Sequence, residues 1–267
     1  MFSRNSIATV GFISSLFLSC GAGAESEWRS SYNGDSLVET NPDLKVALAV
    51  SHFPYKNPKK EISHLGRIFN CSDIEIEEDK FLVKSCLLED GSRQDIIGRL
   101  IKKQDDREIY LQVYAIGEDA GRKETYAEME RLLAEDPISN PRNEWLSNTD
   151  QLQDASTQIF ENRKLGASIS LSASAYLGSK ADNIKSLSKL FLCNKVEATD
   201  NGVNFSNCQS YRYYEIRDLE YPYYLISSVG VDFLNNKEVM DKYHELQKTA
   251  LAQLAIQIEE RKSSDNK

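Results

Sequence analysis

The stretch ISHLGRIFNCSDIEIEEDKFLVKSC, residues 62–86, decides the fold because the chain contains a second copy of it. It aligns without a gap with IKSLSKLFLCNKVEATDNGVNFSNC, residues 184–208, and each copy has two cysteines separated by the same interval. Beyond the cysteines that anchor the alignment, four positions are identical and three are conservatively matched. An internal repeat of this kind predicts two related structural units in tandem.

A helix is predicted before the first cysteine of each copy. Asn57 followed by Pro58 is typical of the start of a helix, and Ser179 with Asp182 forms a capping pair at the start of the second one. Apolar residues then recur at positions i, i+3, i+6 and i+7, which lie on one face of an amphipathic helix. These residues are Ile62, Leu65, Ile68 and Phe69 in the first copy, and Ile184, Leu187, Leu190 and Phe191 in the second.

Between the two cysteines of each copy the apolar period changes to two, which predicts a β-hairpin. Turns at Glu78–Asp79 and at Asp200–Asn201 place the cysteines of each copy opposite each other. This spacing favours the disulfides Cys71–Cys86 and Cys193–Cys208, and a metal site is disfavoured because closely spaced ligand pairs are absent. Strict alternation puts the cysteines opposite the apolar face. Either the bridges lie outside, or the first cysteines precede the regular strands.

The whole chain is predicted to be an α+β protein. Each copy contains a strand, a helix, the hairpin, one or two further strands and a closing helix, so helices would pack on a mainly antiparallel sheet. We expect the two units to span residues 44–136 and 167–262, with a long C-terminal helix in the second. Residues 137–166 are expected to be a linker with a short helix, and residues 25–43 an exposed tether.

The N-terminus predicts export. Residues 7–18 form an apolar run that is too short to span a bilayer and is followed by small residues, as in a secretory signal. Two cleavage sites compete. The A-x-A site at Ala22–Ala24 would remove a signal peptide of residues 1–24, whereas LFLSC resembles a bacterial lipobox, which would remove residues 1–19 and place a lipid on Cys20. Both alternatives predict a protein of the periplasm or cell envelope. Only the second attaches it to a membrane, through the lipid on Cys20.

Composition and motifs disfavour several functions. A formal net charge of −9 and a pI of about 5.0 disfavour nucleic-acid binding, which needs a basic face. The sequence has no P-loop, no G-x-G-x-x-G and no G-x-S-x-G motif. HELQK resembles a zinc-protease motif only in part, because Lys248 replaces the second histidine after His244. We expect no catalytic residue, metal or cofactor, and we interpret His52 and His64 as surface or helix histidines.

One segment favours binding. YRYYEIRDLEYPYYLI, residues 211–226, is dense in tyrosine, and the matching part of the first copy is not. Tyrosine offers rigid contact area with a polar tip, although it is also a good strand residue. The candidate binding residues are Tyr211, Tyr213, Tyr214, Tyr221 and Tyr223. They predict a non-catalytic module that binds an envelope protein or a glycan.

The alternative function is a carboxylate-dependent hydrolase that acts on an envelope polymer. Glu75 and Glu197 occupy equivalent positions in the two copies, and paired carboxylates can act as acid and base on a glycan. A repeated residue more often preserves architecture than catalysis, so binding is the favoured hypothesis.

Overall fold

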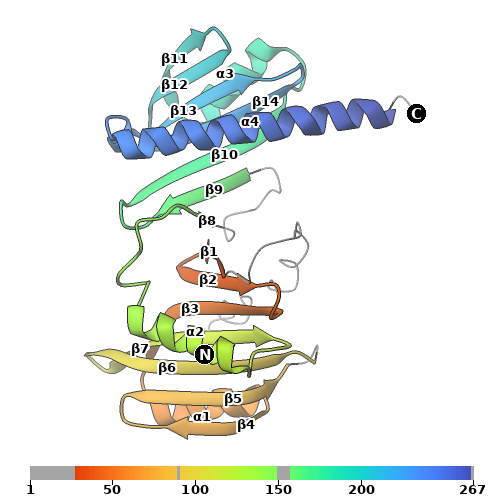
Figure 1. The fold of residues 1–267 in the computed structure, drawn as a ribbon. Helices are drawn as coiled ribbons and strands as arrows, with labels where there is room; N and C mark the ends of the chain where they lie inside the picture. The colour runs from red at the N-terminus through yellow and green to blue at the C-terminus, as the bar shows by residue number, and fades with distance from the viewer. Residues whose placement is uncertain (1–27, 89–90, 149–156, 266–267) are drawn as a thin grey trace. The chain divides into compact units, whose positions relative to one another are not determined.

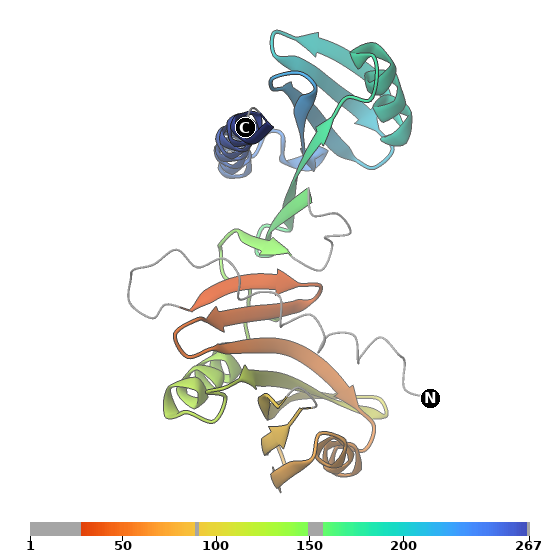
Figure 2. The ribbon, with the colours of Figure 1, turned by 90° about the vertical axis from the view of Figure 1, so that its right-hand side faces the viewer.

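The computed structural model describes residues 28–88, 91–148 and 157–265, and the chain divides into two compact units between Pro141 and Arg142 (Figure 1). Each unit is a sheet of antiparallel strands with helices packed on it. In each unit the two helices lie on opposite faces of the sheet (Figure 2). The described part of the chain contains no helix that is long and apolar enough to cross a membrane.

Unit 1 places its strands in the order β1-β2-β3-β7-β6-β5-β4. The hairpin predicted from residues 71–86 is thus at the end of this order. The elements of the unit are β1 (Arg29–Asn33), β2 (Ser36–Asn41), β3 (Val46–Tyr55), α1 (Pro58–Ile68), β4 (Cys71–Ile76), β5 (Lys80–Leu87), β6 (Arg93–Gln104), β7 (Arg107–Gly117) and α2 (Lys123–Glu135).

Unit 2 places its strands in the corresponding order, β8-β9-β10-β14-β13-β12-β11. The match between the two orders is consistent with two similar units. The elements are β8 (Leu146–Asn148), β9 (Thr157–Asn162), β10 (Ala167–Ala175), α3 (Lys180–Leu190), β11 (Cys193–Thr199), β12 (Gly202–Cys208), β13 (Arg212–Asp218), β14 (Tyr223–Gly230), the 3-10 turn η3 (Val231–Phe233) and α4 (Lys237–Asp265).

Both predicted helix starts are confirmed. The side chain of Asn57 accepts a hydrogen bond from the backbone N–H of Lys60 at 3.2 Å, and Ser179 Oγ accepts one from that of Asp182 at 3.1 Å. The ends of the apolar faces differ from the prediction. The last residue of each helix, Ile68 or Leu190, is 59% or 72% exposed, because the chain turns towards the sheet directly after it and the following phenylalanine packs inward instead.

Both predicted disulfides are present, and each joins residues that are directly paired across a hairpin. Cys86 and Cys208 are buried on the same side as the apolar strand residues, although strict alternation places them on the other side. The cause is the residue before each of them. Ser85 and Asn207 have φ values of 53° and 55°, and a residue in this region interrupts the alternation of the strand.

Two predicted boundaries differ from the structure. The segment 25–43, expected to be an exposed tether, contains β1 and β2, which pair with each other and continue onto β3. Within the expected linker 137–166, the described residues of the second half form β9 and not a helix. Thr157, Ile159 and Phe160 of β9 are of types that favour strands, and the ladder with β10 satisfies its backbone.

Clusters of buried side chains lie beneath helices of both units. One lies under α1 in unit 1 and includes Tyr55, Phe81 and Ile96. In unit 2, a cluster under α4 includes Leu225 and Tyr243, and another lies under α3 beside the disulfide. The two faces of the unit 2 sheet therefore have separate cores, and each core borders one candidate site.

Candidate functional site

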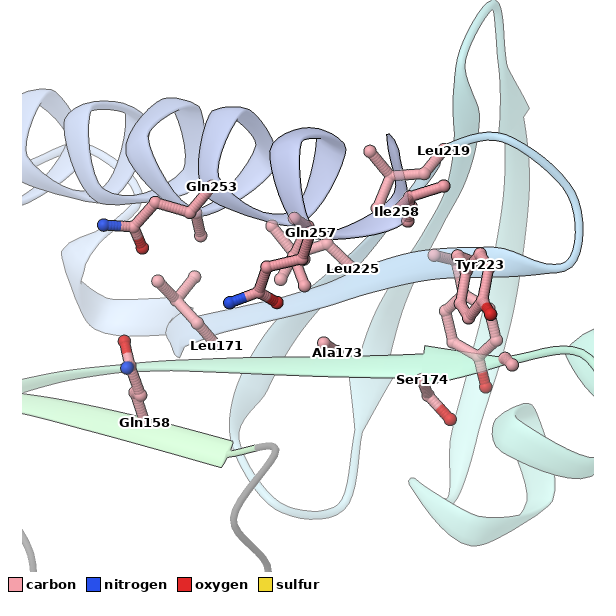
Figure 3. Close-up of a pocket in the computed structure, with 14 residues that line it drawn as sticks. Gln158, Leu171, Ala173, Ser174, Leu219, Tyr223, Leu225, Gln253, Gln257 and Ile258 are labelled. Atoms are coloured by element: carbon pink, nitrogen blue, oxygen red, sulfur yellow. The ribbon is translucent and has the colours of Figure 1, made fainter. Parts of the chain in front are cut away.

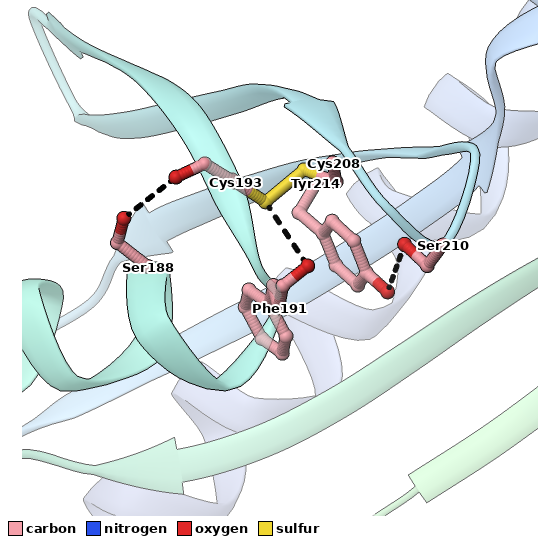
Figure 4. The surroundings of a disulfide bond; sticks show 6 residues. All are labelled: Ser188, Phe191, Cys193, Cys208, Ser210 and Tyr214. Carbon is pink, nitrogen blue, oxygen red and sulfur yellow. Dashed lines mark hydrogen bonds between the residues drawn. A yellow bond between two sulfur atoms is a disulfide. The ribbon is translucent and has the colours of Figure 1, made fainter.

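The five predicted tyrosines do not form one surface. Tyr211 and Tyr221 are 78% and 68% exposed, whereas the other three are partly buried. Tyr214 stacks on Phe191 with ring centroids 4.1 Å apart and planes at 2°, and its hydroxyl lies 3.2 Å from the Ser210 hydroxyl (Figure 4). Tyr213 packs against the core under α4, and burial raises its pKa to about 12. Tyr213 and Tyr214 therefore support the fold.

Three exposed apolar side chains belong to the segments that flank the disulfide Cys193–Cys208. We call Leu190, Leu192 and Tyr211 the leucine–tyrosine surface. Leu192 is 54% exposed, and Leu190 and Tyr211 are 72% and 78% exposed. The carbonyl of Leu192 accepts a hydrogen bond from the backbone N–H of Gln209 at 3.1 Å, and Cys193–Cys208 joins the two segments. The bridge thus fixes the backbone on both sides of this surface.

Backbone conformation distinguishes this surface from its counterpart. Leu192 and Tyr211 have φ values of 52° and 54°, in the left-handed region. Asn70, the residue of unit 1 that aligns with Leu192, has a φ of 48°. Asparagine tolerates this region, whereas a larger side chain there costs about 1–2 kcal/mol. Unit 2 therefore presents two large residues to solvent in an unfavourable backbone conformation.

Tyr221 lies at the other end of α3. Its hydroxyl donates to the carbonyl of Gly178 at 3.1 Å, and its ring stacks on Tyr176, with centroids 6.4 Å apart. Tyr176 in turn stacks on the buried Tyr224 at 4.3 Å. Leu177, beside Gly178, is almost fully exposed. Tyr221 is thus an outer layer of a tyrosine stack, exposed on one face and supported on the other.

A groove in unit 2 separates α4 from the sheet (Figure 3). It has a volume of about 550 Å³, within the range of ligand pockets. The sheet contributes one wall and the helix the other, and we call it the α4 groove. It is lined by Gln158, Leu171, Ala173, Ser174, Ala175, Leu219, Tyr223, Tyr224, Leu225, Ala250, Gln253, Leu254, Gln257 and Ile258. Tyr223 is the candidate tyrosine that the structure places here.

Sequence reasoning missed this groove, because its residues come from β9, β10, β14 and α4. The available signal was weak: small residues at alternate positions of β10, Ala173 and Ala175, combined with Ala250 on α4. Only the pairing of Ala173 with Leu225 and of Ala175 with Tyr223 shows that these residues share one face.

The carboxylates considered for hydrolysis lie on exposed hairpins. Glu75 and Glu197 are more than half exposed, and each has a lysine of its own hairpin within 4.0 Å and 2.8 Å, respectively. Neither lines the α4 groove. The two residues belong to different units.

The histidines are dispersed. His52 lies 3.2 Å from Asp136, and His64 and His244 are exposed on helices. Burial raises the pKa of Asp136, but hydrogen bonds from Ser139 and His52 outweigh it, and the net pKa is below the ordinary value. Within residues 28–88, 91–148 and 157–265, no group of three His, Cys, Asp or Glu side chains could hold a metal ion.

No protein-family model matches the chain, and no curated protein matches it. Among solved structures, a match covers 80% of this chain and 93% of the other, with 12% sequence identity and a TM-score of 0.22. It is the apo structure of immunity protein TplEi of T6SS from Pseudomonas aeruginosa. A similarity at this TM-score supports no argument about fold or function.

Proposed function

We propose that this chain is an exported binding module of the cell envelope, without catalytic chemistry of its own, and that it binds a protein partner. Two hairpin disulfides are typical of proteins from oxidising compartments, which supports export. The alternative cleavages after Ala24 and before Cys20 lie outside the described residues. A soluble form and a lipid-anchored form both agree with this proposal.

The observation that carries the proposal is the leucine–tyrosine surface. Leu192 and Tyr211 occupy an unfavourable backbone region and are nevertheless exposed. Strain of this kind is common where a residue serves function rather than stability. Burying a leucine against a partner contributes about 1.5–3 kcal/mol, which is comparable with the strain of about 1–2 kcal/mol. The free protein lacks that benefit, and a complex would gain it.

The composition of the surface favours a protein over a glycan. Sugars bind by stacking on aromatic rings and by hydrogen bonds, and leucine offers neither. Leu190 and Leu192 instead resemble the apolar centre of a protein interface, with Tyr211 as an aromatic anchor. Tyr221 provides a second exposed aromatic side chain at the far end of α3. A glycan remains an outcome that the experiment below distinguishes.

The decisive variant is Leu192→Asn, which gives unit 2 the residue that unit 1 has at the aligned position. It removes exposed apolar area and relieves the backbone, so we expect the protein to fold at least as stably as the parent. A partner captured from envelope extract by the parent protein would be identified and then titrated in purified form. We expect its Kd to rise by about tenfold or more, as for a residue at the centre of an interface.

A matched pair of variants provides the control. Leu190→Ser and Ile68→Ser change the last residue of α3 and of α1, which are similarly exposed. Only Leu190→Ser, the change in unit 2, should weaken binding of the partner. Equal affinity of the parent, Leu192→Asn and Leu190→Ser for the partner would refute the proposal. Capture of a glycan whose binding requires Tyr221 but not Leu192 would refute the proposal that the partner is a protein.

The hydrolase alternative stays a prediction that no described contact favours. It requires two carboxyl groups about 5–9.5 Å apart in a cleft. The described residues that line the α4 groove include no carboxyl group. Release of soluble fragments from an envelope polymer by the purified protein, abolished by Glu75→Gln or Glu197→Gln, would establish this alternative in place of binding.

A further inference from the structure

Helix α4 is attached to the sheet by a buried polar network in its first half. Tyr243 and Gln247 point at Glu215 of β13, donating to its Oε2 at 3.1 Å and 3.0 Å. Both also contact the Ser227 hydroxyl of β14, at 2.7 Å and 2.9 Å. We call these four residues the Glu215 network. All four are buried, and this half of the helix is therefore held firmly at the sheet.

The C-terminal half of α4 has its own attachment. Lys262 donates to the carboxylate of Glu220, in the loop between β13 and β14. One turn earlier, Ile258 is buried and lies at the end of the groove with Leu219 of the same loop (Figure 3). The ion pair is exposed and contributes little stability. Together with the buried Ile258, it joins the end of the helix to this loop.

Between these attachments the helix is separated from the sheet. Three of the lining residues are alanines, Ala173 and Ala175 on β10 and Ala250 on α4, and these small side chains leave space between the leucines of the two walls. Protein interiors are normally packed to the density of organic crystals. An open groove of about 550 Å³ under a helix that is fixed on both sides is therefore a preformed space, and it does not result from a loose helix.

The chemistry of the walls selects the ligand. None of the described lining residues is charged, so a charged group inside would lose hydration without a partner. The walls are mostly aliphatic, with leucine on both sides and Ile258 at one end. Gln158, Gln253 and Gln257 are exposed at the rim, and their amides both donate and accept hydrogen bonds.

A peptide or a sugar suits these walls poorly. Strands β9, β10 and β14 are hydrogen-bonded to one another, so within the groove the sheet offers no open edge to a peptide backbone. A sugar would bury many hydroxyl groups against leucine and alanine without partners. An aliphatic chain needs no partner and gains from burial of each methylene, about 0.8 kcal/mol.

We propose that the α4 groove binds one acyl chain of an uncharged amphiphile, with the chain between α4 and β10 and the polar end at the glutamines of the rim. This site is separate from the leucine–tyrosine surface, which lies at the disulfide on the other core of unit 2. The molecule would thus have two binding sites with different chemistry.

The test is a titration of the full exported chain, purified without detergent, with lauroyl glycerol. We expect saturable binding with one site and a negative heat-capacity change, the mark of apolar burial. Ala250→Leu fills the groove from the helix and should weaken binding by about tenfold or more. Ala252→Leu, an exposed and non-lining position of the same helix, should leave it unchanged.

A second variant guards against a folding defect in the first. Gln257→Glu keeps the shape of an exposed side chain and adds a charge at the rim, so it should lower affinity for lauroyl glycerol without altering the unfolding midpoint. Equal affinity of the parent and Ala250→Leu, or no saturable binding by the parent, would overturn the proposal. Binding of a chito-oligosaccharide that Ala250→Leu abolishes would overturn the acyl chain as ligand.

Discussion

Removing a single hydroxyl from the Glu215 network should destabilise unit 2 measurably. Tyr243 is fully buried, and Tyr243→Phe leaves its ring in place while deleting the donor to Glu215. Burial strongly raises the pKa of Tyr243, so the hydroxyl is protonated and available as a donor at neutral pH. The substitution therefore tests the hydrogen bond with little change in packing.

The magnitude follows from which partners remain. Glu215 keeps Gln247 and its ion pair with Arg217 at 2.6 Å, and Ser227 keeps Gln247. The substitution removes the hydrogen bond to a buried carboxylate, which is worth about 1.5–3 kcal/mol, together with the contact between the Tyr243 and Ser227 hydroxyls at 2.7 Å. We take the first value as the lower bound of the cost. For a urea dependence of about 1–3 kcal/mol per molar, the unfolding midpoint should fall by about 0.5–3 M.

The assay needs a signal from unit 2 alone. Trp145 packs against the same core as Tyr243, whereas Trp28 belongs to unit 1. In a Trp28→Phe background, urea unfolding followed by tryptophan fluorescence therefore reports the core under α4. Both disulfides stay oxidised throughout, so that the two proteins share the same unfolded reference.

A double-mutant cycle with Glu215→Gln isolates the pair. If the hydroxyl acts on the charge, Tyr243→Phe should cost less in the Glu215→Gln background than in the parent, by about 1 kcal/mol or more. Equal unfolding midpoints of Tyr243→Phe and the parent, or equal costs in both backgrounds, would refute the reasoning.

Three further predictions concern stability. Replacing both Cys193 and Cys208 by Ala should cost unit 2 about 3 kcal/mol, because the bridge closes a loop of 15 residues; urea unfolding of the oxidised parent and the variant gives this value, and no loss would contradict it. The pKa of Asp136 is lower in the folded protein than its ordinary value of 3.8, so its carboxylate stabilises the fold at pH values above 3.8. This stabilisation is lost as the pH falls through the lower pKa of the folded state. Unfolding of Asp136→Asn should therefore depend less on pH between neutrality and about pH 3 than that of the parent, and parallel curves would count against it. Leu192→Asn should stabilise unit 2 by about 1 kcal/mol and so raise its melting temperature, and a melting temperature below that of the parent would show that the backbone of Leu192 is not strained.

The repeat could be predicted from the sequence because its signals are local. Helix caps, the change of apolar period and the turn residues lie within 25 residues in each copy, and together they gave the hairpin register and both disulfides. Burial of the cysteines was not predictable, because it depends on the backbone of Ser85 and Asn207, whose sequence allows ordinary strand angles as well.

Features that depend on distant residues were missed. Glu39 is buried in β2 and is bound by Arg131 at 3.0 Å from far along the chain, so a polar segment expected to be a tether is part of the sheet. The α4 groove likewise requires the register of β10 against β14. Of the five candidate tyrosines, only exposure in the folded chain separates Tyr211 and Tyr221 from those that pack inward.

The two disulfides also determine what happens at the outermost strands. In each unit the bridge joins the last strand of the order, β4 or β11, to its neighbour. The side chains of β11 are exposed along nearly its whole length, so little packing holds this strand in place. A strand edge that detaches can pair with another molecule. Reduction should therefore promote strand exchange between molecules, and this protein would aggregate in a reducing compartment before its cores unfold.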